Sequence, residues 1–244
     1  MKTVNILGIP FNMLTVNQTL DLLESFLDKP TNHIVVTPNP EGVMQARRNP
    51  AFHDALINAD LRLADGTGIV IASRYLKNPL QERVRGVDTI FALLERLTNK
   101  NHNHTAYFLG GAPGIAEKAK KLMEARFPTL SVVGHHHGFF SPEEEQNILE
   151  ELKNLKPDIM LVCTGMPKAE IWATTNRDIP ARITLCLGGT IDIMAGNVKL
   201  APKVMRKLGL EWLARLIRQP SRAKRMLDIP RFVWAVIRSG RAAR

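Results

Sequence analysis

Residues 61–70 read LRLADGTGIV, a short apolar run that ends on a carboxylate, Asp65. One interpretation is structural: an Asp-Gly pair makes a good turn, because the Asp side chain bonds nearby backbone and Gly66 accepts a positive φ. The other is chemical: a carboxylate in a partly dry cleft has a raised pKa and can take a proton from a reacting hydroxyl. The turn is the better explanation unless other residues place a substrate beside Asp65.

Two polar side chains follow another apolar run. In VVTPNPEG, Thr37 and Asn39 each precede a proline. If strands 33–37 and 61–64 are neighbours in one sheet, both side chains lie on the same rim as Asp65. That arrangement makes Asp65 a candidate general base, with Thr37 and Asn39 beside it.

Three glycine-containing loops follow later apolar runs and could hold a phosphate group. Glycines let backbone N–H groups approach a diphosphate, a helix N-terminus favours its negative charge, and a lysine neutralises it. None of these loops has GxGxxG spacing, so each alone is equally well explained as an ordinary turn. Their joint occurrence at successive strand ends favours a nucleotide-type ligand. The candidate residues are Gly110, Gly111, Gly114, Lys168, Gly189 and Thr190.

The stretch VVGHHHGFF contains three consecutive histidines, His135, His136 and His137. Because neighbouring residues in extended chain point to opposite faces, the three are not expected to share one metal ion. The segment through Gly138 instead indicates a strand end that reaches a ligand, with the ring of Phe139 or Phe140 able to stack on a base. We expect no metal site and no cofactor.

These loops need regular elements to carry them. Helical patterns such as TVNQTLDLLESFL and GVDTIFALLERL alternate with short apolar runs: VNIL, HIVVT, LRLA, TAYFLG, LSVVG, DIMLVC and ITLCLG. This alternation predicts a Rossmann-like α/β fold, a mostly parallel sheet with helices on both faces. In such sheets ligands bind beyond the carboxyl ends of the strands.

The formal net charge of +10 comes entirely from the end of the chain. Residues 1–202 hold 21 Lys+Arg and 21 Asp+Glu, whereas residues 203–244 hold 12 and 2. Apolar residues recur at helical spacing in the same segment. We therefore expect an α/β catalytic domain, 1–202, and a basic, amphipathic helical appendage, 203–244. A cationic appendage on a neutral body predicts a polyanionic partner, either membrane headgroups or nucleic acid.

Other features of the composition indicate the compartment. Cys163 and Cys186 lie inside apolar runs, where buried thiols are expected and a disulfide is not. The start MKTVNILGIPFNM lacks the charged-then-apolar layout of a secretory signal. No run approaches the roughly 18 apolar residues of a membrane-spanning helix. These features predict a cytoplasmic protein.

Separated motifs recur in order over nearly the whole chain: TPNPE, ADG-G, RVRGVD, FLGG-PG, HGFF, G-PK-E-W, GG-IDI-AG and GLEWL-RL. Together they resemble the WecG/TagA/CpsF family of bacterial glycosyltransferases. The resemblance implies transfer of a sugar, with inversion, from a UDP-sugar to a sugar already carried on undecaprenyl diphosphate, during assembly of cell-wall teichoic acid or another polysaccharide. N-acetylmannosamine is the sugar expected. The resemblance also implies an appendage that closes over the site and docks on the inner face of the cell membrane.

The resemblance further implies roles for individual residues. Asp65 would be the base, near Thr37 and Asn39. Positive charge is needed beside the departing diphosphate, and no metal ion is expected to supply it. The substrate-binding residues expected are Arg83, Arg85, Gly110, Gly111, Gly114, Gly138, Phe139, Lys168, Glu170, Gly189, Thr190, Asp192, Arg215, Arg218 and Arg222.

One position departs from the family's pattern, and several questions stay open. The family's loop usually reads PKQE, whereas this chain has Ala169 in place of the glutamine; if that amide contacts substrate, activity is reduced here. An alternative function is a nucleotide-binding protein whose basic tail stacks on nucleic acid, although no recognition motif appears. The appendage could also be an ordinary packed helix followed by a solvated end, or its apolar face at 204–217 could seal a second copy in a homo-oligomer.

Overall fold

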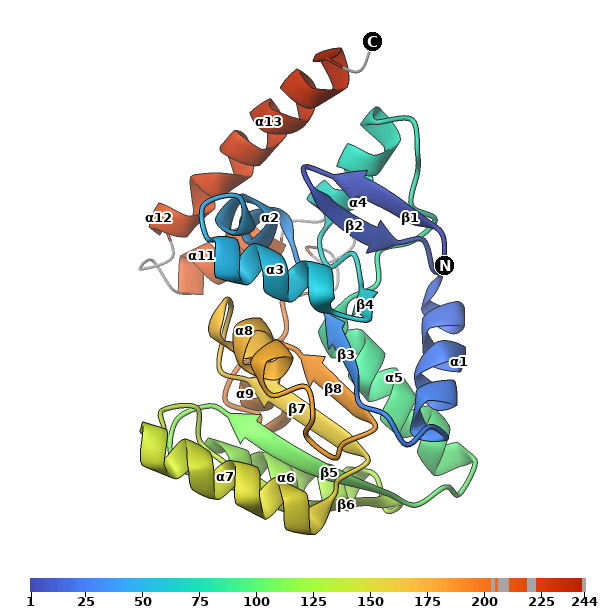
Figure 1. Cartoon of the computed structure of the whole chain (residues 1–244), viewed down its shortest axis with the longest axis vertical. Coiled ribbons are helices and arrows are strands. Elements are labelled where there is room, and N and C mark those ends of the chain that lie inside the picture. Colours follow the sequence, from blue (N-terminus) through green and yellow to red (C-terminus); the bar gives the residue numbers. More distant parts are fainter. Residues whose placement is uncertain (203–204, 206–210, 219–222, 243–244) are drawn as a thin grey trace.

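A six-stranded parallel sheet organises the molecule (Figure 1). The computed structural model describes residues 1–202, 205, 211–218 and 223–242. All neighbouring strands of the sheet are parallel, which confirms the predicted architecture. In spatial order the strands are β4 (Leu61–Arg62), β3 (His33–Val36), β8 (Ile183–Cys186), β7 (Ile159–Cys163), β5 (His104–Gly110) and β6 (Leu130–His136).

Helices cover both faces of this sheet, as the alternation predicts. One apolar cluster joins the strands to α1 (Val16–Leu27), α5 (Gly86–Asn99), α6 (Ile115–Arg126) and α9 (Thr190–Met194). The opposite cluster includes α2 (Pro40–Ala46), α3 (Pro50–Asn58), α4 (Thr67–Tyr75), α7 (Pro142–Leu155) and α8 (Lys168–Thr175).

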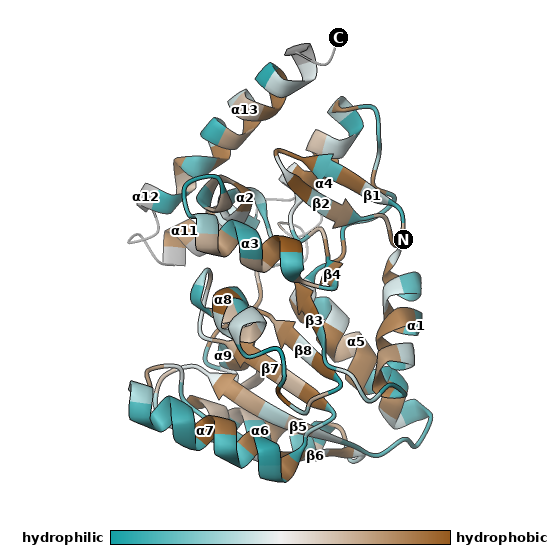
Figure 2. Ribbon diagram, viewed as in Figure 1, coloured by the Kyte–Doolittle hydropathy of each residue, from teal (hydrophilic) through white to brown (hydrophobic). Residues whose placement is uncertain are grey.

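Successive residues of a strand divide between the two clusters. In β5, Ala106 and Phe108 belong to the cluster of α6, whereas Tyr107 and Leu109 belong to the cluster of α7. Strands buried on both faces need apolar side chains at every position. That requirement explains the near-continuous apolar runs, which appear brown in Figure 2 beside the largely teal α7.

The adjacency on which the predicted rim depends is present. Val35 lies opposite Leu61 and Val36 opposite Arg62, so β3 and β4 are neighbours. The backbone N–H of Leu63 donates to the Val36 carbonyl at 2.9 Å and extends the pairing beyond β4. The chain therefore leaves both strands at the same end of the sheet.

The N-terminal run VNIL does not join the parallel sheet, which corrects its place in the predicted alternation. β1 (Thr3–Ile6) pairs antiparallel with β2 (Ile9–Asn12) in a separate two-stranded sheet. Leu7 and Gly8 supply the positive φ values, 53° and 97°, that a two-residue hairpin turn requires. Four apolar residues look alike in a hairpin and in a parallel strand, so the pattern alone did not distinguish them.

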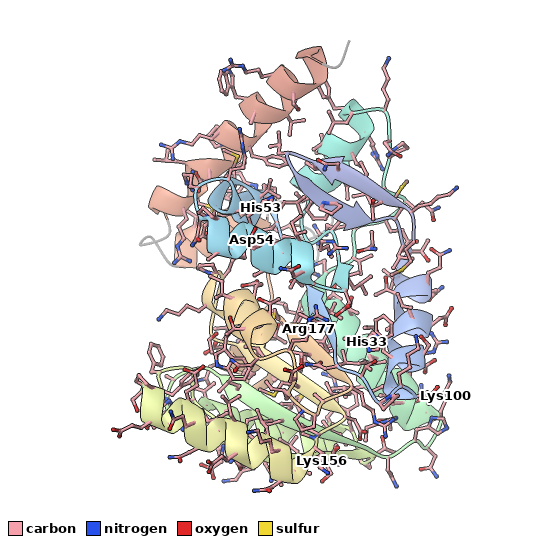
Figure 3. The ribbon with its side chains drawn as sticks, viewed as in Figure 1. His33, His53, Asp54, Lys100, Lys156 and Arg177 are labelled. Atoms are coloured by element: carbon pink, nitrogen blue, oxygen red, sulfur yellow. The ribbon has the colours of Figure 1, made fainter. Side chains whose placement is uncertain are left out.

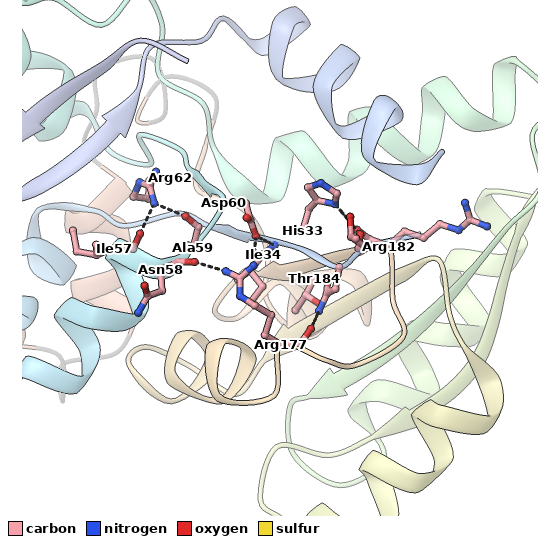
Figure 4. Close-up of polar contacts among 12 residues, drawn as sticks. His33, Ile34, Ile57, Asn58, Ala59, Asp60, Arg62, Arg177, Arg182 and Thr184 are labelled. Carbon is pink, nitrogen blue, oxygen red and sulfur yellow. Dashed lines mark hydrogen bonds and ion pairs between the residues drawn. The ribbon is translucent and has the colours of Figure 1, made fainter. Parts of the chain in front are cut away.

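Charged side chains secure the amino ends of β3 and β4 (Figure 4). Asp60 accepts hydrogen bonds from the Ile34 backbone at 2.8 Å and from Arg177 at 2.9 Å. Arg62 donates from Nε to the Pro10 carbonyl at 2.7 Å and so fastens the hairpin to β4. Asp60 and Arg177 thus hold the starts of the two strands, whereas Arg62, the last residue of β4, fastens the hairpin beside their other end.

The described part of the C-terminal segment is helical, as expected. Phe232, Ala235 and Val236 are buried in the same cluster as α2 and α4, against which the last helix packs. Asp228 accepts two hydrogen bonds from Arg48, at 2.8 and 2.5 Å. The end of the segment is thus part of the body's core, and the domain boundary at 202 stays a prediction. The helices are α11 (Glu211–Arg218), α12 (Ala223–Met226) and α13 (Asp228–Ala242).

Two further expectations concern the class of protein. Cys163 and Cys186 are buried free thiols, as predicted, and burial raises the pKa of Cys163 to about 12. Among the described helices, none combines the length and apolar character needed to cross a bilayer.

Candidate functional site

Thr37, Asn39 and the Asp65 loop gather at one rim of the sheet. The Thr37 hydroxyl donates to the Cys186 carbonyl at 3.3 Å, across the ends of β3 and β8. A Cβ added to Gly66 would lie 3.5 Å from Asn39 Cβ, so the residue after Asp65 touches Asn39. The structure therefore brings these three predicted residues into one place.

The same residues also have structural uses, as the alternative interpretation of the Asp-Gly pair anticipated. Gly66 has a φ of +139°, and the half-buried Asp65 donates its backbone N–H to the Leu63 carbonyl at 3.0 Å. Asn39 caps α2, because its Oδ1 accepts a hydrogen bond from the Gly42 backbone at 2.8 Å. A turn residue and a cap residue thus stand at the rim where the chemistry was predicted.

Arg83 runs along the Asp65 loop. The Val84 backbone donates to the Ala64 carbonyl at 3.2 Å, and Arg83 Nη1 donates to Thr67 Oγ1 at 2.9 Å. The side chain of Arg83 is 18% exposed, so it reaches the rim without extending into bulk water. Arg83 is therefore the predicted cation that contacts the loop of the candidate base, at Thr67.

Arg85 is placed differently. Its side chain is 9% exposed and lies between two carboxylates, with Nη1 2.5 Å from Asp88 and Nη2 3.0 Å from Glu211. Glu211 also accepts a hydrogen bond from Arg83 Nη2 at 3.0 Å. Sequence reasoning did not single out Glu211, although it stands in the GLEWL motif of the basic appendage, where a carboxylate is rare.

Glycines line the ends of β5, β6 and β7. A Cβ added to Gly110 would meet the Cys163 carbonyl carbon at 2.6 Å. The Gly138 backbone donates to the Gly111 carbonyl at 2.8 Å, and Gly114 caps α6 with a φ of +82°. These residues bring three strand ends into close contact, and only at Gly114 would an added Cβ meet no described atom within 4 Å.

The loop after β8 adds Gly189, Thr190 and Asp192. Gly189 precedes α9, which is five residues long. The buried Thr190 hydroxyl donates to the Leu187 carbonyl at 2.7 Å, so it serves the turn itself. Asp192 is half-buried in the first turn of α9.

A cavity of about 340 Å³ lies beside β6, β7 and α8. It includes the predicted residues Gly138 and Lys168, while Phe139 points away and is 76% exposed. Thr164 Oγ1 and Trp172 Nε1 are buried there without a hydrogen-bond partner among the described residues. Of the two phenylalanines that could stack on a base, Phe140 is the one that lines the cavity. The lining residues are Gly138, Phe140, Glu145, Thr164, Lys168, Ile171, Trp172, Thr175 and Asn176.

Glu170, predicted to bind substrate, is buried at 5% exposure. Burial raises the pKa of its carboxyl to about 7, and within the described part of the chain its Oε2 has no hydrogen-bond partner. The charge of Glu170 raises the pKa of Cys186, so the carboxyl lies near the end of β8. Ala169 is fully buried in the apolar cluster beside it.

The histidine run contains one close pair, contrary to the expectation from extended chain. The rings of His136 and His137 have centroids 4.3 Å apart, and these residues and Glu144 offer ligand atoms within 4.8 Å of one another. The alternation argument was wrong for this pair, because β6 ends at His136. Glu144 is also engaged in the capping box that starts α7, where it accepts from the Ser141 backbone at 2.6 Å. The absence of a metal site stays a prediction.

The three appendage arginines have a different status. Arg215 and Arg218 belong to α11, but their side chains are not among the described parts of the chain. Arg222 lies outside the described residues altogether. Their predicted contacts with substrate stay predictions.

Comparison with known proteins decides the family. The sequence model of the Glycosyl transferase WecG/TagA/CpsF family matches residues 4–244. The chain belongs to this family. It is therefore a glycosyltransferase, which agrees with the resemblance carried by the motifs.

Curated relatives in this family come from Staphylococcus aureus. The protein of strain MW2, named N-acetylglucosaminyldiphosphoundecaprenol N-acetyl-beta-D-mannosaminyltransferase, is 33% identical over 241 residues, which cover 98% of this chain and 93% of the relative. The proteins of strains NCTC 8325 and MRSA252 bear the same name, at 33% and 32% identity. The WecG/TagA/CpsF similarity thus extends through the appendage as well as the α/β body.

Proposed function

We propose that this chain transfers N-acetylmannosamine, with inversion, from a UDP-sugar to N-acetylglucosamine carried on undecaprenyl diphosphate. The names and full-length similarity of the Staphylococcus aureus relatives support the sugar and the acceptor. The observation that carries the proposal is the rim on which Asp65 lies with Thr37, Asn39 and Arg83. The cation, Arg83, contacts Thr67, which follows the candidate base Asp65 by two residues.

The reaction follows from the chemistry of such a rim. Asp65 takes the proton of the acceptor hydroxyl as its oxygen bonds to the anomeric carbon of the donor. The bond between that carbon and the diphosphate oxygen breaks on the opposite face, which inverts the configuration. UDP departs with the electron pair, and the proton stays on Asp65 until solvent removes it.

The departing diphosphate needs positive charge and backbone donors. Arg83 at the rim and the exposed Lys168 at the start of α8 are the candidates among the described side chains. The loop before α6 is the candidate for the backbone donors, because Gly114 precedes that helix and an added Cβ there would meet no described atom within 4 Å. The reaction as proposed uses these groups and no metal ion.

The acceptor is a lipid, so the enzyme has to work at a membrane. We assign this role to residues 203–244, with 12 basic and 2 acidic residues, as a peripheral contact with anionic headgroups on the inner face of the cell membrane. On α13, Val233 and Trp234 are 50% and 63% exposed, and Arg238 lies over the Trp234 ring at 5.3 Å. Aromatic and basic side chains together suit a headgroup interface.

Replacing the candidate base tests the reaction. Asp65→Asn is expected to lower turnover by at least about 10²-fold, because general-base catalysis contributes that much, while UDP binding measured by calorimetry persists. Asp54→Asn on α3 is the matched control, since the Asp54 side chain is 72% exposed (Figure 3). Unchanged turnover in Asp65→Asn would remove Asp65 from the base role.

A panel of UDP-sugars tests the substrates. Each is incubated with a lipid-diphosphate-GlcNAc analogue, and products are read by mass spectrometry. UDP-N-acetylmannosamine is expected to give the fastest transfer, and another preferred donor would replace the sugar in the proposal.

A further inference from the structure

The appendage contacts the rim through one carboxylate. Glu211, the first residue of α11, accepts from Arg83 Nη2 and lies equally close to Arg85 Nη2, each at 3.0 Å. The side chains of Glu211, Arg83 and Arg85 are only 16%, 18% and 9% exposed. Charges so largely withdrawn from water hold a fixed geometry better than an exposed pair.

The appendage has few carboxylates, and each of them binds the body of the protein. Residues 203–244 contain two acidic residues among 12 basic ones, and both contact arginines of the body. Asp228 binds Arg48 and anchors α13, whereas Glu211 binds the two arginines at the rim. The two carboxylates are thus separate attachment points, one on the core and one at the site.

The arginines that Glu211 holds are connected to the Asp65 loop. Arg83 donates from its other terminal nitrogen to Thr67 Oγ1 at 2.9 Å, and the Val84 backbone bonds the Ala64 carbonyl at 3.2 Å. The next residues also reach the rim, because a Cβ added to Gly86 would lie 3.0 Å from Thr37 Cγ2. A shift of Arg83 would therefore move Thr67, which lies two residues from Asp65 in the chain.

We infer that Glu211 is a positioning residue, which orients Arg83 beside the Asp65 loop and docks α11 at the rim. This inference rests on the proposed function, because it assigns Arg83 a place beside the departing diphosphate. Glu211 leaves Arg83 with donors to spare, since a guanidinium has five N–H groups. It acts through Arg83 and touches no reacting atom.

A double-mutant cycle separates positioning from general stabilisation. Glu211→Ala is expected to lower kcat about tenfold or more, with a smaller change in KM, because small misplacements of catalytic groups are costly. In an Arg83→Ala background the same change should lower kcat by less than about twofold. Asp228→Asn serves as the control within the appendage, and its effect should be the same in both backgrounds. Equal effects of Glu211→Ala in both backgrounds would overturn the positioning role.

Hydrogen exchange supplies a readout that does not depend on activity. Glu211→Ala and the milder Glu211→Gln are expected to speed exchange in residues 211–218 and 82–88, whereas Glu150→Gln on the exposed side of α7 should not. Unchanged exchange at both segments would overturn the docking contact. An inactive wild-type chain would overturn the proposed function and the positioning role with it, while exchange would still report whether Glu211 docks α11.

Discussion

At the scale of single residues, Glu170 makes stability depend on pH. Its pKa is raised by burial from 4.5 to about 7, so between these values the folded chain holds a proton that the unfolded chain has lost. Stability is then fully present below pH 4.5 and falls as pH rises to about 7. Relative to Glu170→Gln, the wild type should lose up to about 3 kcal/mol over this window.

Urea denaturation at several pH values checks this prediction. The difference between wild type and Glu170→Gln should grow from pH 4.5 to pH 7 and then stay constant. Glu150→Gln, at an exposed carboxylate, should show no such growth. Parallel curves for the wild type and Glu170→Gln would mean that Glu170 ionises inside the fold at its ordinary pKa.

Gly110 tests how tightly the strand ends meet. Gly110→Ala places a Cβ 2.6 Å from the Cys163 carbonyl carbon at a φ of +148°, and should cost about 2–5 kcal/mol. Gly114→Ala is the control, because Gly114 also has a positive φ, +82°, but its added Cβ meets no described atom within 4 Å. It should cost only about 1–2 kcal/mol. Equal unfolding free energies for the two variants, measured in urea, would contradict the close approach.

At the scale of elements, α13 should behave as part of the core. Phe232→Ala removes a side chain that is 2% exposed and should lower the unfolding free energy by about 3–5 kcal/mol. Val233→Ala, at the adjacent position with 50% exposure, should lower it by less than about 0.5 kcal/mol. Small and equal losses in chemical denaturation would show that α13 does not depend on this packing.

Sequence reasoning predicted elements better than their partners. Apolar periodicity predicted the parallel sheet, because that pattern follows from burial on two faces, whereas the adjacency of β3 and β4 entered only as a condition that the structure meets. It missed that Thr3–Ile6 forms a hairpin with Ile9–Asn12, since pairing partners leave no trace in a four-residue run. Nor did it predict that Phe232 of α13 would be buried in the core of the body, at 2% exposure.

The candidate site shows the same division. Residue type and position at strand ends were enough to bring Thr37, Asn39 and Asp65 together. Contacts between residues far apart in the sequence could not be predicted in this way. Glu211 binds Arg83 across 128 residues, and nothing in either motif indicates that pair. Periodicity could not decide between Phe139 and Phe140, because side-chain direction at an irregular strand end depends on backbone that periodicity does not determine; Phe140 is the one that lines the cavity.

At the scale of the whole molecule, the asymmetry of charge predicts membrane binding. Trp234→Ala should weaken binding to vesicles of anionic lipid by about thirtyfold, since a buried aromatic side chain contributes about 2 kcal/mol. Thermal stability should change little, because Trp234 is 63% exposed. Ile57→Ala on α3 is the control at an exposed apolar residue. Equal flotation of both variants with vesicles would place the contact elsewhere.

The docking of α13 through Phe232 and Asp228 makes this helix a stiff arm and not a tether. A flexible tether would let the rim at Asp65 lie at many distances from a bilayer, whereas a rigidly packed helix fixes that distance. If α13 contacts the membrane as proposed, the enzyme would act on acceptors whose sugar stands at one fixed distance from the lipid.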